Sequence, residues 1–180
     1  MKIKLARFRL KFISEKGFTL IEVLIVVAVV ASIAGLTITT FGNYSKSQVF
    51  NQTYNNFLNI LNTAKSRSSS QDKPLSIAQC AAAGAVLNGY SVTINKAAAP
   101  NNYSLNVICS NTVVVLPGYS QLPLPAGVTF GGSSLTSIFF PIITGGAVLN
   151  NSGLASGTIT FTSGSLTKSI TIDGKTGRIQ

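Results

Sequence analysis

The sequence contains no histidine and no tryptophan, and only four of its 180 residues are acidic. General acid–base catalysis and metal binding both depend on His, Asp, Glu and Cys side chains that lie close together. Beyond the N-terminal apolar segment the only acids are Asp72 and Asp173, so a catalytic carboxylate pair would require those two to meet. The two cysteines alone cannot complete a zinc site. The composition therefore argues against an enzyme, and we expect no catalytic residue, no metal site and no cofactor.

Charge is scarce and unevenly distributed. Charged residues make up 10% of the chain, and the formal net charge is +10. Half of this excess precedes residue 18, where six Lys and Arg residues accompany a single Glu. A nucleic-acid-binding surface requires clustered cations, whereas the remaining cations are scattered over residues 46–178. The pI near 10 is therefore weak evidence for a nucleic-acid partner.

A long apolar run follows the basic start. Residues 18–38 contain one charged residue, Glu22, and no Lys or Arg. About 20 apolar residues in a helix span the hydrocarbon core of a bilayer. The preceding cations place the N-terminus in the cytoplasm and the rest of the chain outside. The sequence therefore predicts a basic leader over residues 1–17 and a single membrane-spanning helix over residues 18–38.

Glu22 is the unusual residue of this run. A carboxylate within a membrane segment costs about 2.5–3.5 kcal/mol on translocon-derived scales, and such residues usually have a partner and a function. A plain signal anchor does not explain Glu22, and the remaining alternative is a protonated Glu without a role. We therefore expect Glu22 to have a functional partner.

The residues around Glu22 resemble a known family. The stretch Lys16–Ile25 is similar to the cleavage and methylation motif of type IV prepilins. The resemblance implies that a membrane-bound prepilin peptidase and methyltransferase cuts between Gly17 and Phe18 and N-methylates the new amino group of Phe18. It also implies that Glu22 pairs with the Phe18 ammonium of a neighbouring subunit, so that each charge satisfies the other. The implied partners are other pilin or pseudopilin subunits and inner-membrane lipid, and the implied location is the bacterial inner membrane and then a filament.

Helical periodicity continues beyond the apolar run. We predict an amphipathic second half of the helix over residues 39–70, ending within 66–70 because Pro74 prevents continuation. Its aromatic face is either a ligand stripe or, far more commonly, a face that packs on the chain's own sheet. The residues on this face share helical spacing: Phe50, Tyr54, Phe57, Leu58, Leu61 and Ala64.

Residues 71–180 show short alternating segments between Gly, Pro, Asn and Ser, which predicts a β-rich globular domain. Asp173-Gly174 is a turn signal that joins the last two segments as a hairpin. The candidate strands are Leu75–Cys80, Tyr90–Asn95, Ser104–Cys109, Thr112–Leu116, Gly127–Phe130, Ser137–Pro141, Gly157–Thr162, Lys168–Asp173 and Thr176–Ile179.

The order of these elements resembles the type IV pilin architecture. That is an α+β fold in which a long N-terminal helix, transmembrane in its first half, packs on a C-terminal antiparallel β-sheet or sandwich domain outside the membrane. More narrowly, Gly157–Thr162, Ser169–Asp173 and Gly177–Ile179 are similar to the late strands of the minor pseudopilin group usually called GspH/FimT.

The two cysteines, Cys80 and Cys109, both fall in the predicted exported region. An even count in an oxidising compartment favours a disulfide. The alternative is two buried free thiols on neighbouring strands.

The tail contains the remaining candidate site. In DNA-binding members of the minor pilin group a C-terminal G-R-x-R motif contributes cations, but this chain ends Gly177-Arg178-Ile179-Gln180 and lacks the second arginine. If Lys168, Lys175 and Arg178 share one face, they would give at best weak, salt-sensitive contacts to phosphates. We therefore expect a structural subunit, a minor pilin or pseudopilin of a type IV pilus or type II secretion filament. The alternative is a DNA-binding or adhesive tip subunit of a DNA-uptake pilus.

Overall fold

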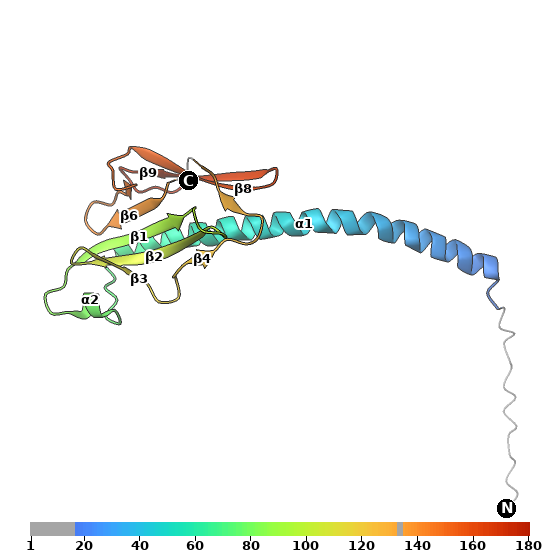
Figure 1. Cartoon of the computed structure of the whole chain (residues 1–180), viewed down its shortest axis with the longest axis horizontal. Helices are drawn as coiled ribbons and strands as arrows, with labels where there is room; N and C mark the ends of the chain where they lie inside the picture. The colour runs from blue at the N-terminus through green and yellow to red at the C-terminus, as the bar shows by residue number, and fades with distance from the viewer. Residues whose placement is uncertain (1–16, 133–134) are drawn as a thin grey trace, which may run out of the picture. The chain divides into compact units, whose positions relative to one another are not determined.

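The computed structural model describes residues 17–132 and 135–180, with the backbone alone for 34–41 and 43. In this part of the chain a long helix, α1 (Leu20–Ser69), precedes a short helix, α2 (Ala78–Ala81), and a series of strands (Figure 1). The chain divides into two compact units, Met1–Tyr44 and Ser45–Gln180. The predicted leader lies outside the described residues except for its last residue, Gly17.

Helix α1 begins where the sequence supplies an N-cap. The Thr19 hydroxyl oxygen accepts a hydrogen bond of 3.3 Å from the Glu22 backbone N–H. The Thr19 carbonyl also accepts from the N–H groups of Glu22 and Val23. Thr-x-x-Glu is the spacing of a capping box, in which polar side chains satisfy the exposed donors of the first helical turn. The helix start is therefore encoded in the same short motif that contains Glu22.

The first unit consists of the N-terminal part of α1. Every side chain described from Leu20 to Ile33 is exposed. Among the described residues, no helix combines the length and the apolar character needed to cross a membrane. The predicted membrane span over 18–38 is therefore not confirmed.

The second unit combines the rest of α1 with two antiparallel sheets, as the α+β expectation requires. The larger sheet has the order β3-β2-β1-β6-β7, with β4 also pairing with β2, and the smaller has the order β5-β8-β9. The strands are β1 (Leu87–Asn95), β2 (Asn102–Cys109), β3 (Thr112–Val115), β4 (Leu122–Pro123), β5 (Thr129–Phe130), β6 (Ser137–Pro141), β7 (Val148–Leu149), β8 (Ser156–Ser163) and β9 (Leu166–Asp173).

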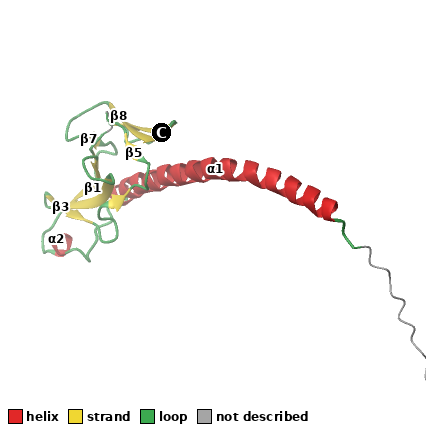
Figure 2. Ribbon diagram, turned by 45° about the vertical axis from the view of Figure 1, so that its right-hand side comes forward, coloured by secondary structure: helices red, strands yellow, loops and turns green. Residues whose placement is uncertain are grey.

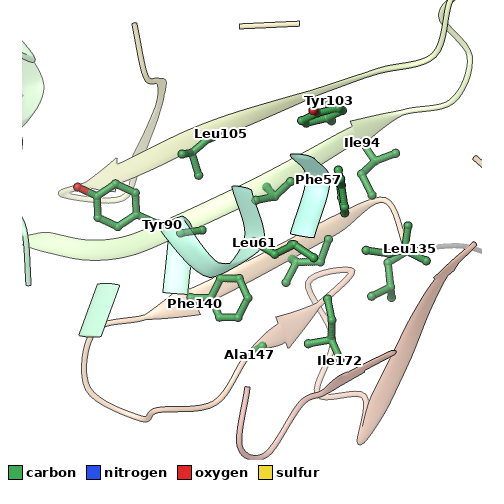
Figure 3. Close-up of a cluster of buried hydrophobic side chains, with 14 of the residues drawn as sticks. Phe57, Leu61, Tyr90, Ile94, Tyr103, Leu105, Leu135, Phe140, Ala147 and Ile172 are labelled. Atoms are coloured by element: carbon green, nitrogen blue, oxygen red, sulfur yellow. The ribbon is translucent and has the colours of Figure 1, made fainter. Parts of the chain in front are cut away.

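The C-terminal part of α1 runs alongside the strands of the second unit (Figure 2), and one stripe of its side chains provides the centre of the core (Figure 3). The Phe57 ring meets Tyr103 of the larger sheet with centroids 4.9 Å apart, and Phe130 and Phe161 of the smaller sheet at 5.7 and 5.3 Å. Edge-on contacts between aromatic rings add to the burial of their area. The helix therefore joins both sheets through one aromatic cluster, and the predicted sheet-facing stripe is confirmed. Four of its predicted residues are fully or almost fully buried: Phe50, Phe57, Leu61 and Ala64.

Two predicted strands are wrong. Residues 75–80 form a turn followed by α2, because the buried side chains Ile77 and Cys80 lie three positions apart, which is helical spacing. Residues 176–179 form the end of a turn and a short irregular segment rather than a strand. This segment runs back along β9: the Asp173 N–H donates to the Arg178 carbonyl, and Ile172 and Ile179 form an isolated antiparallel bridge. The turn at Asp173-Gly174 itself is present as predicted.

Glycines allow two loops to pack closely at one end of the second unit. A Cβ on Gly174 would lie 2.1 Å from the Leu154 carbonyl oxygen, and one on Gly146 would lie 2.7 Å from the Gly174 carbonyl oxygen. Both distances are below any real contact of a Cβ atom. Backbone therefore packs directly on backbone at this junction, and the Ala147 N–H donates to the Gly174 carbonyl at 2.8 Å.

Candidate assembly site

The predicted cleavage site lies just before α1. Gly17, Phe18 and Thr19 are not helical, and α1 begins at Leu20. The Phe18 side chain is 79% exposed, and no atom approaches the position of a Cβ on Gly17 within 4 Å. A peptide bond in an exposed, non-helical segment is open to a protease. The geometry is therefore compatible with processing between Gly17 and Phe18.

Glu22 lies in the first turn of α1, where the positive end of the helix dipole favours a carboxylate. It is the only charged side chain among the described residues of the first unit, and its side chain is exposed. The one ion pair in the described part of the chain, between Arg67 and Asp72, lies elsewhere. The Glu22 carboxylate thus has no cationic partner within the described chain.

The surface around Glu22 is apolar on all sides. From Phe18 to Ile33 the large aliphatic and aromatic side chains are all half or more exposed, including Leu20 at 81% and Ile21 at 68%. A helix that is hydrophobic all round is normally buried in a large core or a membrane. We therefore expect apolar groups from outside the described chain to contact this segment. Glu22 is the only charged side chain in the segment that such a contact would enclose.

This segment matches a known sequence motif. Residues 14–38 match the model of the prokaryotic N-terminal methylation motif. The chain carries a type IV prepilin-like motif. This motif implies a type IV pilin- or pseudopilin-like subunit, processed by prepilin peptidase and assembled with other pilins. No curated protein and no solved structure matches the chain.

The structure does not bring the three candidate DNA-contacting cations together. Lys168 lies at the start of β9, whereas Lys175 and Arg178 follow its end. Five residues of extended strand separate Lys168 from Asp173, which is about 17 Å. The Lys168 ammonium lies 4.9 Å from the centroid of the Tyr54 ring, a cation–π contact within the domain. The three cations are therefore dispersed along β9 and beyond its end, and the expectation that they share one face stays a prediction.

Asp173 ends β9, just before the turn that contains Lys175. Its carboxylate accepts hydrogen bonds from the Thr176 backbone N–H at 2.8 Å and from the Thr176 hydroxyl at 3.0 Å. These bonds favour the charged form and lower the pKa of the Asp173 carboxyl. The acid therefore favours its charged form two residues before Lys175 and offsets part of the positive potential of that residue.

The two cysteines form a disulfide. Cys80 of α2 and Cys109 at the end of β2 are both fully buried, with their Cα atoms 5.3 Å apart. The bond attaches the segment after α1 to the end of β2 in the larger sheet. No three His, Cys, Asp or Glu side chains lie close enough together to hold a metal ion in the part of the chain that the structure describes.

One functional residue of the motif was missed by sequence reasoning. Thr19 caps α1 and thereby fixes where the helix starts relative to the cleavage site. The signal was available, because Thr19 stands three residues before Glu22 and precedes an apolar run.

Proposed function

We propose that this chain is a minor pilin or pseudopilin, a structural subunit of a type IV pilus or type II secretion filament. The observation that carries the proposal is the methylation motif at residues 14–38, whose Glu22 lies in an exposed apolar helix and has no cationic partner among the residues that the structure describes. Such a helix suits lipid before assembly and the helices of other subunits after it, because both offer apolar cover.

In this proposal prepilin peptidase removes residues 1–17 and the new Phe18 amino group is methylated. Residues 18–38 hold the subunit in the bacterial inner membrane, with the N-terminus in the cytoplasm and residues 71–180 outside. On assembly the Glu22 carboxylate pairs with the Phe18 ammonium of a neighbour, and each charge offsets the cost of burying the other. The late strands β8 and β9 support a place in the GspH/FimT group, since their residues resemble that group.

The DNA-binding alternative has less support. Lys168, at the start of β9, contacts Tyr54, whereas Lys175 and Arg178 follow the end of β9 and lie close in sequence to the acid Asp173. Phosphate affinity rises with the number of cations that reach the backbone together. A structural subunit is therefore the function that the arrangement supports best.

Mass spectrometry of the chain purified from the producing cell tests the proposal. The expected mature chain begins at Phe18, with a methyl group on its amino nitrogen, and cells without the peptidase retain the full-length chain. A mature chain that begins at any other residue contradicts the proposal.

A further inference from the structure

Strand β3 forms one edge of the larger sheet, with β2 on its inner side (Figure 1). Its sequence, Thr112–Val115, contains three consecutive valines and no charged residue. Val113 is 57% exposed and Val115 is 41% exposed, so two apolar side chains of this edge lie in contact with solvent. Edge strands of soluble proteins usually carry a charge or a covering segment, because an unprotected edge pairs with other chains.

The turn between β2 and β3 decides which backbone groups of β3 face outward. Its two residues, Ser110 and Asn111, have φ values of 50° and 63°, as in a two-residue type I′ hairpin. In such a hairpin the flanking pair exchanges hydrogen bonds, and bonded and non-bonded pairs then alternate along the ladder. The N–H and C=O groups of Val113 and Val115 therefore point away from β2. None of these groups bonds to another segment of the described chain.

The other edges of the described sheets are short or protected. Strands β4, β5 and β7 contain two residues each, and a bridge between Leu149 and Gly153 follows β7. Strand β9 is longer, but its outer edge pairs with the chain's own tail, where Thr171 and Gln180 exchange two hydrogen bonds of 2.9 Å. Lys168 adds a charge to the rest of β9. Among the described edges, β3 therefore stands out in combining four residues, apolar side chains and unpaired backbone groups.

The free backbone groups of β3 specify an extended polypeptide as the occupant. N–H and C=O groups at alternate residues are matched by another β-strand, whose backbone offers the same groups at the same repeat. The exposed valines favour apolar side chains at alternate positions of that strand. Ile108 pairs with Val113, so it lies on the same face of the sheet, and it is only half-buried. It extends the apolar surface next to the edge.

Charge indicates which kind of polypeptide binds. The second unit carries eight Lys and Arg residues against two acids, Asp72 and Asp173. A second copy of the chain carries the same excess and is repelled, as are residues 1–16, which contain six Lys and Arg against one acid. An acidic segment is attracted, because complementary charge speeds the encounter and suppresses like-charged partners.

We propose that β3 is a docking site at which an extended, acidic segment of another protein adds as a further strand of the larger sheet. The segment pairs with the outward backbone groups of Val113 and Val115 and packs its apolar side chains beside theirs. The site lies wholly in the second unit and does not depend on the filament role of α1, so it is a binding function in addition to the one proposed above.

A soluble peptide tests the site. The probe is a fluorescent peptide of sequence Asp-Val-Thr-Val-Thr-Val-Asp, blocked at both ends, and the full chain is held in detergent micelles. We expect saturable binding by fluorescence anisotropy, and the binding should weaken as salt is added. Val113→Lys should weaken it roughly fivefold or more, because one cross-strand apolar contact is lost and a Lys protects the edge.

The matched control separates this loss from an effect of charge. Ile143→Lys adds the same cation at a position that is 85% exposed and lies outside β3, and it should bind the probe as the wild type does. Both positions are exposed, so both variants should fold. Because an added cation attracts an acidic probe, weaker binding by Val113→Lys cannot arise from its charge.

Hydrogen exchange measures the backbone pairing directly. Saturating probe should slow exchange of the Val113 and Val115 amides severalfold, as followed by NMR. The Val114 amide, which already bonds to β2, should change little. The same peptide with methyl groups on the backbone nitrogens of its valines and threonines cannot form the ladder and should not bind.

Each alternative gives a distinct result. Absence of saturable binding, equal binding by Val113→Lys and the wild type, or binding of the methylated peptide would overturn the proposal. If a peptide of residues 1–16 binds more tightly than the acidic probe, the leader is the occupant and the proposal is wrong. If Val113→Lys reduces the apparent size of the full chain in gel filtration, β3 pairs with a second copy, and the choice of an acidic partner is wrong.

Discussion

The Ser68 hydroxyl donates a hydrogen bond of 2.6 Å to the Phe140 carbonyl oxygen and so joins the last turn of α1 to strand β6 inside the core. Ser68 is 1% exposed, and its hydroxyl could find no water there. This single polar contact fixes how the end of the helix lies on the larger sheet.

Ser68→Ala should therefore destabilise the chain although it removes only one oxygen. A buried group that loses its partner costs about 1–3 kcal/mol. Chemical denaturation of the full chain measures the loss, and Ser69→Ala at the neighbouring exposed position should change stability by less than about 0.5 kcal/mol. Equal stability of the two variants would show that the bond contributes nothing.

Glu22→Ala should leave cleavage at Gly17 intact but lower incorporation into filaments. The variant removes the one carboxylate available to pair with a neighbour's ammonium, while the Thr19 cap remains. Glu22→Gln keeps the size of the side chain and removes only its charge, so it should fail as well. Immunoblots of sheared filaments and of membranes measure incorporation and cleavage. Normal incorporation of Glu22→Gln would mean that charge pairing is unnecessary.

Reduction of the disulfide should weaken the second unit. Cys80 and Cys109 close a loop with a sequence separation of 29, and a crosslink of that length restricts the unfolded chain by about 3–4 kcal/mol. Urea unfolding with and without reductant measures the difference. The double variant Cys80→Ala, Cys109→Ala should match the reduced wild type and show no further response to reductant. A wild type that unfolds at the same urea concentration in both conditions contradicts the prediction.

The final turn should loosen in acid. Hydrogen bonds from Thr176 lower the pKa of the Asp173 carboxyl below its ordinary value of 3.8. A carboxyl with a lowered folded pKa contributes stability that is full above the unfolded pKa and is lost as the pH falls through the folded pKa. The return segment Arg178–Gln180 should therefore separate from β9 below pH 3.8.

An NMR titration of the Asp173 carboxyl carbon checks this behaviour. Thr176→Val removes the hydroxyl donor and keeps the backbone donor, so the pKa should move part of the way back toward 3.8. If the Asp173 carboxyl titrates identically in Thr176→Val and in the wild type, the Thr176 hydroxyl does not contribute to the lowered pKa, and the bond from the Thr176 backbone N–H accounts for it.

Much of the fold follows from local pattern. Helical spacing from Phe50 to Ala64 predicts the face of α1 that packs on the sheets, and alternation predicts β1, β2, β6, β8 and β9. The strands β4 and β7, which were not predicted, contain only two residues each, which is too short for any alternation. Their pairing depends on partners far along the chain, as does the division of the strands between two sheets.

In the candidate site, too, some features follow from the sequence alone and others depend on the fold. Gly17, Phe18 and Glu22 are identified by a contiguous motif, so the sequence alone locates them. The position of Lys168 over Tyr54 depends on how β9 packs against α1, since the two residues are far apart in sequence.

The contact of backbone with backbone at Gly146 and Gly174 limits which substitutions the chain can accept at these two positions. No side chain fits at either position, while nearby side chains such as Thr144 and Lys175 are exposed. In a library selected only for secretion of folded protein, these two glycines should persist while the neighbouring loop residues vary. New binding specificities would then arise on loops whose attachment points, Gly146 and Gly174, stay unchanged.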